Sequence, residues 1–104
     1  MIRHIVFFSA GKPEHVPAVL DGLRLLQRIP HGSVVEVRPN LKIDQLANEV
    51  DAVVYAEFAD EAALLAYKAH PLYAEATARV RPLRELRIAA DVSAGPDEHS
   101  GPAD

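Results

Sequence analysis

Four stretches of the chain alternate between two faces, as strands of a sheet do. The alternation predicts strands at about residues 2–8, 33–41, 51–59 and 83–91. In the first stretch both faces are largely apolar, and one of them carries His4 together with Ile2, Val6 and Phe8. A strand of that kind is typically covered on both sides. Because a proline cannot donate to a ladder, Pro39 predicts that the second strand lies at an edge or contains a bulge.

Two segments between these strands have the three- and four-residue spacing of amphipathic helices. Residues 14–29 form the first, with one apolar stripe made of Val16, Val19, Leu20, Leu23, Leu26 and Ile29. Pro17 is tolerated only near the start of a helix, and Pro30 lies just beyond the end of the stripe. We therefore expect a single helix that begins at Glu14 or His15.

The second helical segment follows Asp60, a residue that caps helices well, and Glu61, whose charge suits a helix N-terminus. Pro71 disfavours the helical conformation at the preceding residue, so the helix should break or kink at His70. A short helical segment from about residue 72 to 79 would complete the second helical region.

The resulting order, βαββαβ, predicts a ferredoxin-like α+β protomer with a four-stranded antiparallel sheet and both helices on one face. The helix-free face would carry several apolar side chains, namely Ile5, Phe7, Val53, Tyr55, Leu86 and Ile88. Monomers seldom expose such a patch, so we expect a homodimer in which a second copy covers this face through a two-fold interface. The alternative is a monomer with a partly apolar sheet surface.

Composition and length limit the number of domains and the kinds of partner that this chain can have. The 104 residues suffice for one domain, expected at residues 1–92, and residues 93–104 lack apolar periodicity and are expected to be a disordered tail. No apolar run is long enough for a membrane helix, and there is no cysteine, so we expect no membrane partner and a cytoplasmic location. The net charge of −4 argues against nucleic-acid binding.

Four sequence segments resemble stress-responsive α/β-barrel (Dabb) domain proteins. They are Met1 to Phe8, Asp51 to Phe58, Ala66 to Tyr73, which contains the His70-Pro71 pair, and Arg87 to Asp91. The resemblance spans about residues 1–92 and implies a ferredoxin-like protomer whose dimer forms a barrel from two sheets. Most bacterial members of this family have no assigned activity.

A plant member of the family cyclises a polyketide thioester in a cavity between sheet and helices, using a tyrosine and a histidine together. The resemblance places Tyr67 at the tyrosine position and Tyr73 where that histidine stands. It also implies that His4 lines the cavity. A further histidine of the plant protein corresponds roughly to Ala52 here, so the set of acid–base residues differs.

These considerations single out three candidate catalytic residues, His4, Tyr67 and Tyr73. A histidine beside tyrosine hydroxyls is suited to moving protons or polarising a carbonyl. Alternative interpretations stay open: His4 as a core histidine with satisfied nitrogens, and the tyrosines as residues at the edge of the core. Candidate ligand-binding residues are His70, Arg87, Val54 and Phe58. For His70 the alternative is a helix cap, and for Arg87 a solvated strand charge.

The chain contains no motif for a metal or cofactor. Its five histidines lack metal-ligand spacing, and no glycine-rich phosphate loop is present. We therefore expect no cofactor, and a small apolar or carbonyl compound as the ligand of the cavity. Three functions remain: acid–base chemistry on a carbonyl or polyketide-type compound, a stress-protective structural dimer without turnover, and a monooxygenase of the wider dimeric α/β-barrel superfamily.

Overall fold

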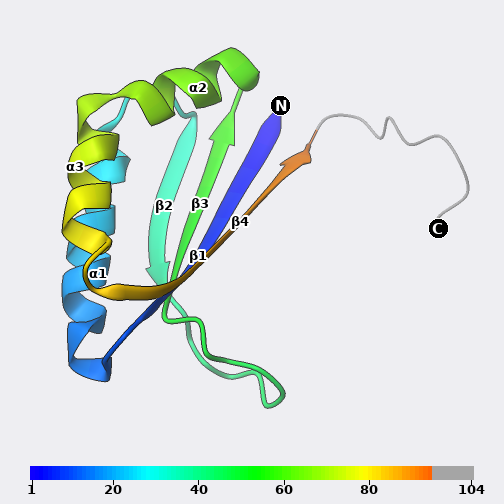
Figure 1. Cartoon of the computed structure of the whole chain (residues 1–104). Helices are drawn as coiled ribbons and strands as arrows, with labels where there is room; N and C mark the ends of the chain where they lie inside the picture. The colour runs from blue at the N-terminus through cyan, green and yellow to red at the C-terminus, as the bar shows by residue number, and fades with distance from the viewer. Residues whose placement is uncertain (95–104) are drawn as a thin grey trace, which may run out of the picture.

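The computed structural model describes residues 1–94 (Figure 1). Its elements in chain order are β1 (Ile2–Ala10), the 3₁₀ turn η1 (Pro13–His15), α1 (Val16–Leu23), the 3₁₀ segment η2 (Arg24–Arg28), β2 (Val34–Pro39), β3 (Ala52–Phe58), α2 (Glu61–Ala69), α3 (Pro71–Val80) and β4 (Arg84–Ser93). The predicted βαββαβ order is confirmed.

The four strands form one antiparallel sheet in the order β2-β3-β1-β4. The strand β1 lies in the centre, where Ile2 faces Phe58 and Phe8 faces Ala52 on β3. The helices cover one face of the sheet and leave the other free of helices, as Figure 1 shows. Because β2 is an edge strand, Pro39 costs no internal ladder bond there, as expected.

The core lies between the sheet and the helices. Side chains at alternate strand positions meet an apolar surface of α1, η2, α2 and α3, and the buried set includes Val6, Phe8, Val54, Phe58, Val19, Leu23, Leu26 and Val80. His4 belongs to the same buried face and is 1% exposed. The alternation of the first and third strands therefore places His4 among apolar neighbours, on the side of the helices.

The first helix differs from the expectation of one helix over residues 14–29. Only Val16–Leu23 is α-helical, and 3₁₀ segments precede and follow it. A 3₁₀ helix has three residues per turn, so residues three apart lie on the same side. Leu23, Leu26 and Ile29 have that spacing and are all buried, which explains how the apolar stripe continues although the α-helix has ended.

The second helical region follows the prediction closely. Asp60 caps α2, since its Oδ1 accepts a hydrogen bond of 2.8 Å from the amide of Ala63. His70 is extended, with φ −68° and ψ 142°, and separates α2 from α3. The helix break therefore lies where Pro71 predicted it.

The last strand is longer than the predicted 83–91. It continues to Ser93, which pairs with Ile2, and the amide of Ala94 donates to the carbonyl of Met1 over 2.9 Å. Ser93, expected in the tail, is therefore part of the sheet because β1 offers it a partner. The rest of the expected tail, residues 95–104, lies outside the described residues. None of the helices in residues 1–94 is long and apolar enough to cross a membrane.

Candidate functional site

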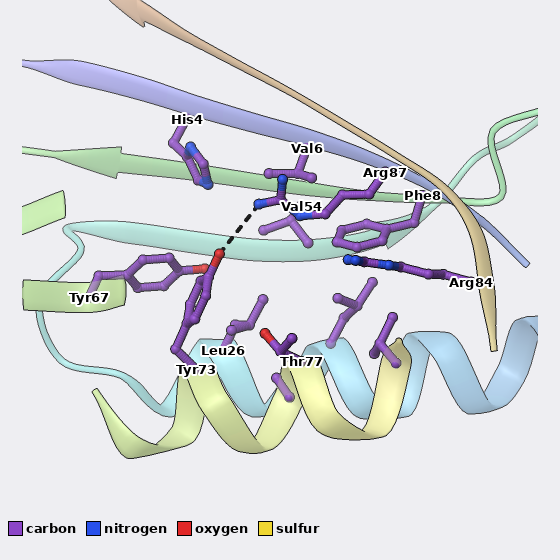
Figure 2. Close-up of a pocket in the computed structure, with 13 residues that line it drawn as sticks. His4, Val6, Phe8, Leu26, Val54, Tyr67, Tyr73, Thr77, Arg84 and Arg87 are labelled. Carbon is purple, nitrogen blue, oxygen red and sulfur yellow. Dashed lines mark hydrogen bonds between the residues drawn. The ribbon is translucent and has the colours of Figure 1, made fainter. Parts of the chain in front are cut away.

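A cavity lies between the sheet and the helices (Figure 2). Its volume is about 370 Å³, part of it open to solvent. Most of its wall is apolar and consists of Val6, Phe8, Leu23, Leu26, Val54, Ala76 and Val80. Six polar or charged side chains complete it, namely His4, Tyr67, Tyr73, Thr77, Arg84 and Arg87. An apolar space with a few convergent polar groups is the usual make-up of a small-molecule site.

His4 is held in place by the last strand. The register of β1 against β4 places it opposite Asp91, and its Nδ1 lies 2.6 Å from Oδ1 of that residue. An ionised carboxylate only accepts hydrogen bonds, so Nδ1 carries the proton in this pair. In a neutral imidazole the other nitrogen, Nε2, is then an acceptor. Since the ring points into the cavity (Figure 2), Nε2 is the atom available to a ligand.

Tyr67, in the last turn of α2, is fully buried among aromatic rings. Its ring centroid lies 4.9 Å from that of Phe58, 6.2 Å from that of His4 and 5.4 Å from that of Tyr73. Figure 2 shows its hydroxyl directed toward the cavity. None of the hydrogen bonds within residues 1–94 involves this hydroxyl.

Burial and the neighbouring Tyr73 raise the pKa of Tyr67 well above its usual value, although Arg87 acts in the opposite direction. Loss of the proton would leave a negative charge in an apolar surrounding, which is costly. At neutral pH the Tyr67 hydroxyl is therefore a proton-bearing group that can donate a hydrogen bond to a ligand.

Tyr73 and Arg87 close another side of the cavity. Tyr73 lies in the first turn of α3 and Arg87 on β4, and Nη2 of Arg87 donates a hydrogen bond of 3.3 Å to the Tyr73 hydroxyl (Figure 2). The bond is long, so it holds the two side chains only loosely. Both groups keep further hydrogen-bonding capacity for a ligand.

The structure brings most of the predicted site residues together. His4, Tyr67, Tyr73, Val54 and Arg87 all line the cavity.

Two other candidates lie outside the lining. Phe58 packs against the ring of Tyr67 and supports it, while Nδ1 of His70 accepts a hydrogen bond of 3.1 Å from the amide of Leu72. His70 thus caps α3, which is the alternative to ligand binding that we considered from the sequence.

Three polar residues of the site were missed from the sequence, namely Asp91, Thr77 and Arg84. Alternation along the last strand does place Arg87 and Asp91 on one face. It does not reveal that Asp91 lies opposite His4, because the register between the first and last strands depends on tertiary pairing. Within residues 1–94, no three metal-ligating side chains gather in a group that could hold a metal ion.

The topology and the cavity define a ferredoxin-like α+β protein with a partly polar cavity between sheet and helices. Residues 2–94 match the family model of the Stress responsive A/B Barrel Domain, or Dabb. The chain therefore belongs to the Dabb family. No curated protein matches it.

Several solved structures share the fold. A dimeric ferredoxin-like protein of unknown function from Thermobifida fusca is 27% identical, with a TM-score of 0.75, covering 89% of this chain and 90% of that chain. A Dabb family protein from Mesorhizobium loti is 24% identical, with a TM-score of 0.74, covering 91% and 97%. An antibiotic biosynthesis monooxygenase is 21% identical, with a TM-score of 0.71, covering 92% and 100%. The last two similarities concern the fold alone.

Proposed function

We propose that the cavity binds a small carbonyl compound and that His4 and Tyr67 catalyse a proton transfer on it. The observation that carries this proposal is the arrangement of His4, whose Nδ1 is held by Asp91 while Nε2 is left for the cavity. A base held in one tautomer and orientation beside a hydroxyl donor suits the enolisation of a carbonyl compound. Such a reaction needs no redox cofactor.

The step follows from the chemistry of the two side chains. Nε2 of His4 takes a proton from the carbon next to the carbonyl, and the C–H bonding electrons form the carbon–carbon double bond of an enolate. The carbonyl π electrons move to the oxygen, where a hydrogen bond from the Tyr67 hydroxyl stabilises the developing charge. The imidazolium of His4 then exchanges its proton with solvent, and delivery of the solvent-derived proton to the same carbon restores the ketone and completes an exchange.

Other residues have supporting roles in this proposal. Asp91 acts through His4, as a positioning residue that stabilises the imidazolium formed in the step. Tyr73 and Arg87 contact the ligand on the β4 side, and Val54 contributes to its apolar surroundings. Phe58 keeps the ring of Tyr67 in place.

We also propose that the protein is a homodimer formed through the helix-free face of the sheet. On that face Phe7 is 37% exposed, Ile88 53% and Val92 46%. Neighbouring positions of the paired strands add half-buried apolar side chains, among them Ile5 and Val53. The dimeric state of the similar protein from Thermobifida fusca supports a second copy as the cover. A cytoplasmic location stays a prediction.

Proton exchange tests the catalytic proposal directly. The purified protein is incubated with butyrophenone and acetophenone in D₂O, and the loss of the protons next to the carbonyl is followed by NMR. We expect exchange above the buffer rate, reduced by about 10²-fold or more in His4→Gln, because general-base catalysis supplies about that factor. Tyr67→Phe should slow the reaction without abolishing it. His15→Gln, which changes a histidine outside the cavity, is the matched control.

Equal exchange rates with and without protein would refute the catalytic proposal and favour the protective dimer without turnover. So would an unchanged rate in His4→Gln. A monooxygenase activity has only the shared fold in its favour and is not proposed.

A further inference from the structure

Within residues 1–94, two positive charges in the cavity have no carboxylate partner. Arg84 and Arg87 line it, whereas no aspartate or glutamate does. Among residues 1–94 neither arginine takes part in an ion pair, although the nearby Arg79 pairs with Glu75 at 2.9 Å. In this part of the chain, the side-chain hydrogen bond of Arg87 goes to the hydroxyl of Tyr73, at 3.3 Å.

A bulge in β4 brings both arginines to the same face of the sheet. Residues three apart in a regular strand point to opposite faces. Here the pairing shifts, so that Ser9 faces Leu86 and Ala10 faces Arg84, with Glu85 as the extra residue. Bulges of this kind re-aim side chains and are over-represented beside functional sites. As a result the guanidinium groups of Arg84 and Arg87 both enter the cavity from β4 (Figure 2).

The surroundings disfavour the positive charge of Arg84. Its side chain is half-buried, and burial, together with repulsion from Arg87 and Arg81, lowers its pKa from the usual value. An anion between the guanidinium groups would relieve both the lost hydration and the repulsion. This concentration of positive charge stands out in a chain whose net charge is −4.

We propose that the ligand of the cavity is an amphiphilic carboxylate, an oxo acid whose carboxylate binds Arg84 and Arg87 and whose carbonyl lies at His4 and Tyr67. This inference rests on the proposed function and specifies its substrate class. A guanidinium presents parallel N–H donors that match a carboxylate in a bidentate manner. The apolar wall, including Phe8 and Leu26, suits the hydrocarbon part of such an acid and not an inorganic anion.

A matched pair of probes tests the inference. 3-Benzoylpropionate and butyrophenone share a carbon skeleton and a ketone, but only the first carries a carboxylate. Dissociation constants are measured by titration of ¹⁵N-labelled protein. We expect the acid to bind at least about tenfold more tightly than the ketone, since hydrogen bonds to charged groups contribute about 1.5–3 kcal/mol. Its binding should weaken as the salt concentration rises.

Three variants make the test specific. Arg84→Gln and Arg87→Gln should each remove most of the advantage of the acid, so that the two dissociation constants approach one another. Arg81→Gln is the matched control, because it removes a neighbouring charge that does not line the cavity. Thermal unfolding followed by circular dichroism checks that each variant is folded.

The outcomes separate this inference from the proposed catalysis. Arginine-dependent binding of the acid without proton exchange on either probe would support the carboxylate site and refute the catalysis. Exchange that depends on His4, with equal affinity for acid and ketone, would support the catalysis and overturn the carboxylate site. Inorganic phosphate binding through the same arginines, with no preference for the acid over the ketone, would also overturn it.

Discussion

Nδ1 of His4 lies 2.6 Å from Oδ1 of Asp91, and this contact joins the first strand of the sheet to the last. The imidazole is buried, whereas the carboxylate side chain is 42% exposed. The pair therefore connects the cavity to solvent through one hydrogen bond. The same hydrogen bond determines which ring nitrogen of His4 carries the proton.

Replacing Asp91 with asparagine should change that proton's position. The wild-type imidazole should carry its proton on Nδ1, because the carboxylate accepts there. In Asp91→Asn the amide can accept or donate, so both tautomers become populated, and stability should fall by about 1 kcal/mol. Long-range ¹H–¹⁵N NMR of the histidine rings measures the tautomer. Asp21→Asn, which alters an exposed pair with Arg24, should leave the His4 signals unchanged. A single Nδ1–H tautomer in both the wild type and Asp91→Asn would contradict this account.

The Tyr67 hydroxyl should contribute little to folding. The ring is fully buried, but no hydrogen bond within residues 1–94 involves the oxygen. Tyr67→Phe should therefore change the free energy of unfolding by less than about 1 kcal/mol, whereas Tyr67→Ala should cost about 3–5 kcal/mol through the lost packing. Urea unfolding measures both. A large loss in the phenylalanine variant would assign the hydroxyl a structural role instead of a role in ligand binding.

The alkaline stability should depend on the same residue. The raised pKa of Tyr67 keeps the phenol protonated in the folded state, while an unfolded chain ionises it near pH ~10. The contribution of the buried Tyr67 phenol to the free energy of unfolding is therefore fully present below pH ~10 and is lost as the pH rises above that value. Tyr67→Phe should show a shallower loss of stability between pH 9 and 11 than the wild type, as measured by urea midpoints. Parallel curves would contradict the raised pKa.

An aspartate on the helix-free face should abolish the proposed dimer. Ile88→Asp places a charge where Ile88 is 53% exposed and faces Phe7 across the strands. Burying that charge in an interface costs several kcal/mol, so sedimentation velocity at micromolar concentration should give a monomer. Leu65→Asp on α2 is the matched control, because Leu65 is exposed to a similar degree, 58%, but lies on the side of the helices. A dimer in both variants would place the interface elsewhere.

The contact between α1 and α3 should not tolerate a methyl group at Gly22. A β-carbon there would lie 2.8 Å from Cγ2 of Val80 and 3.3 Å from Cβ of Arg79. Although alanine favours helices, Gly22→Ala should destabilise the protein by about 1–3 kcal/mol through overpacking. When Val80 is already replaced by alanine, the same Gly22→Ala change should cost less stability than it does in the wild type, because the clashing methyl group is gone. Thermal unfolding measures the four proteins, and additive effects would show that the two sites do not touch.

Local patterns in the sequence were sufficient for the order of the elements. Asp60 and Pro71 mark the start of α2 and the break at His70 because capping and proline sterics act within a few residues. Alternation placed His4 on the side of the helices and Phe7 on the opposite face for the same reason. The first helix was the exception, since a spacing of three fits both an α-helix and the 3₁₀ segment in which Leu26 is buried.

The site itself depended on contacts between distant parts of the chain. His4 and Asp91 are 87 positions apart, and only the register of β1 against β4 brings them together. One extra residue in β4 likewise turns Arg84 toward the cavity, an effect that no periodicity in the sequence reveals. Residue alternation is thus enough to assign the side chains of each strand to two faces, because a side chain's direction follows from the local backbone. Tertiary structure decided which side chains meet, because strand register and bulges depend on pairing across the whole sheet.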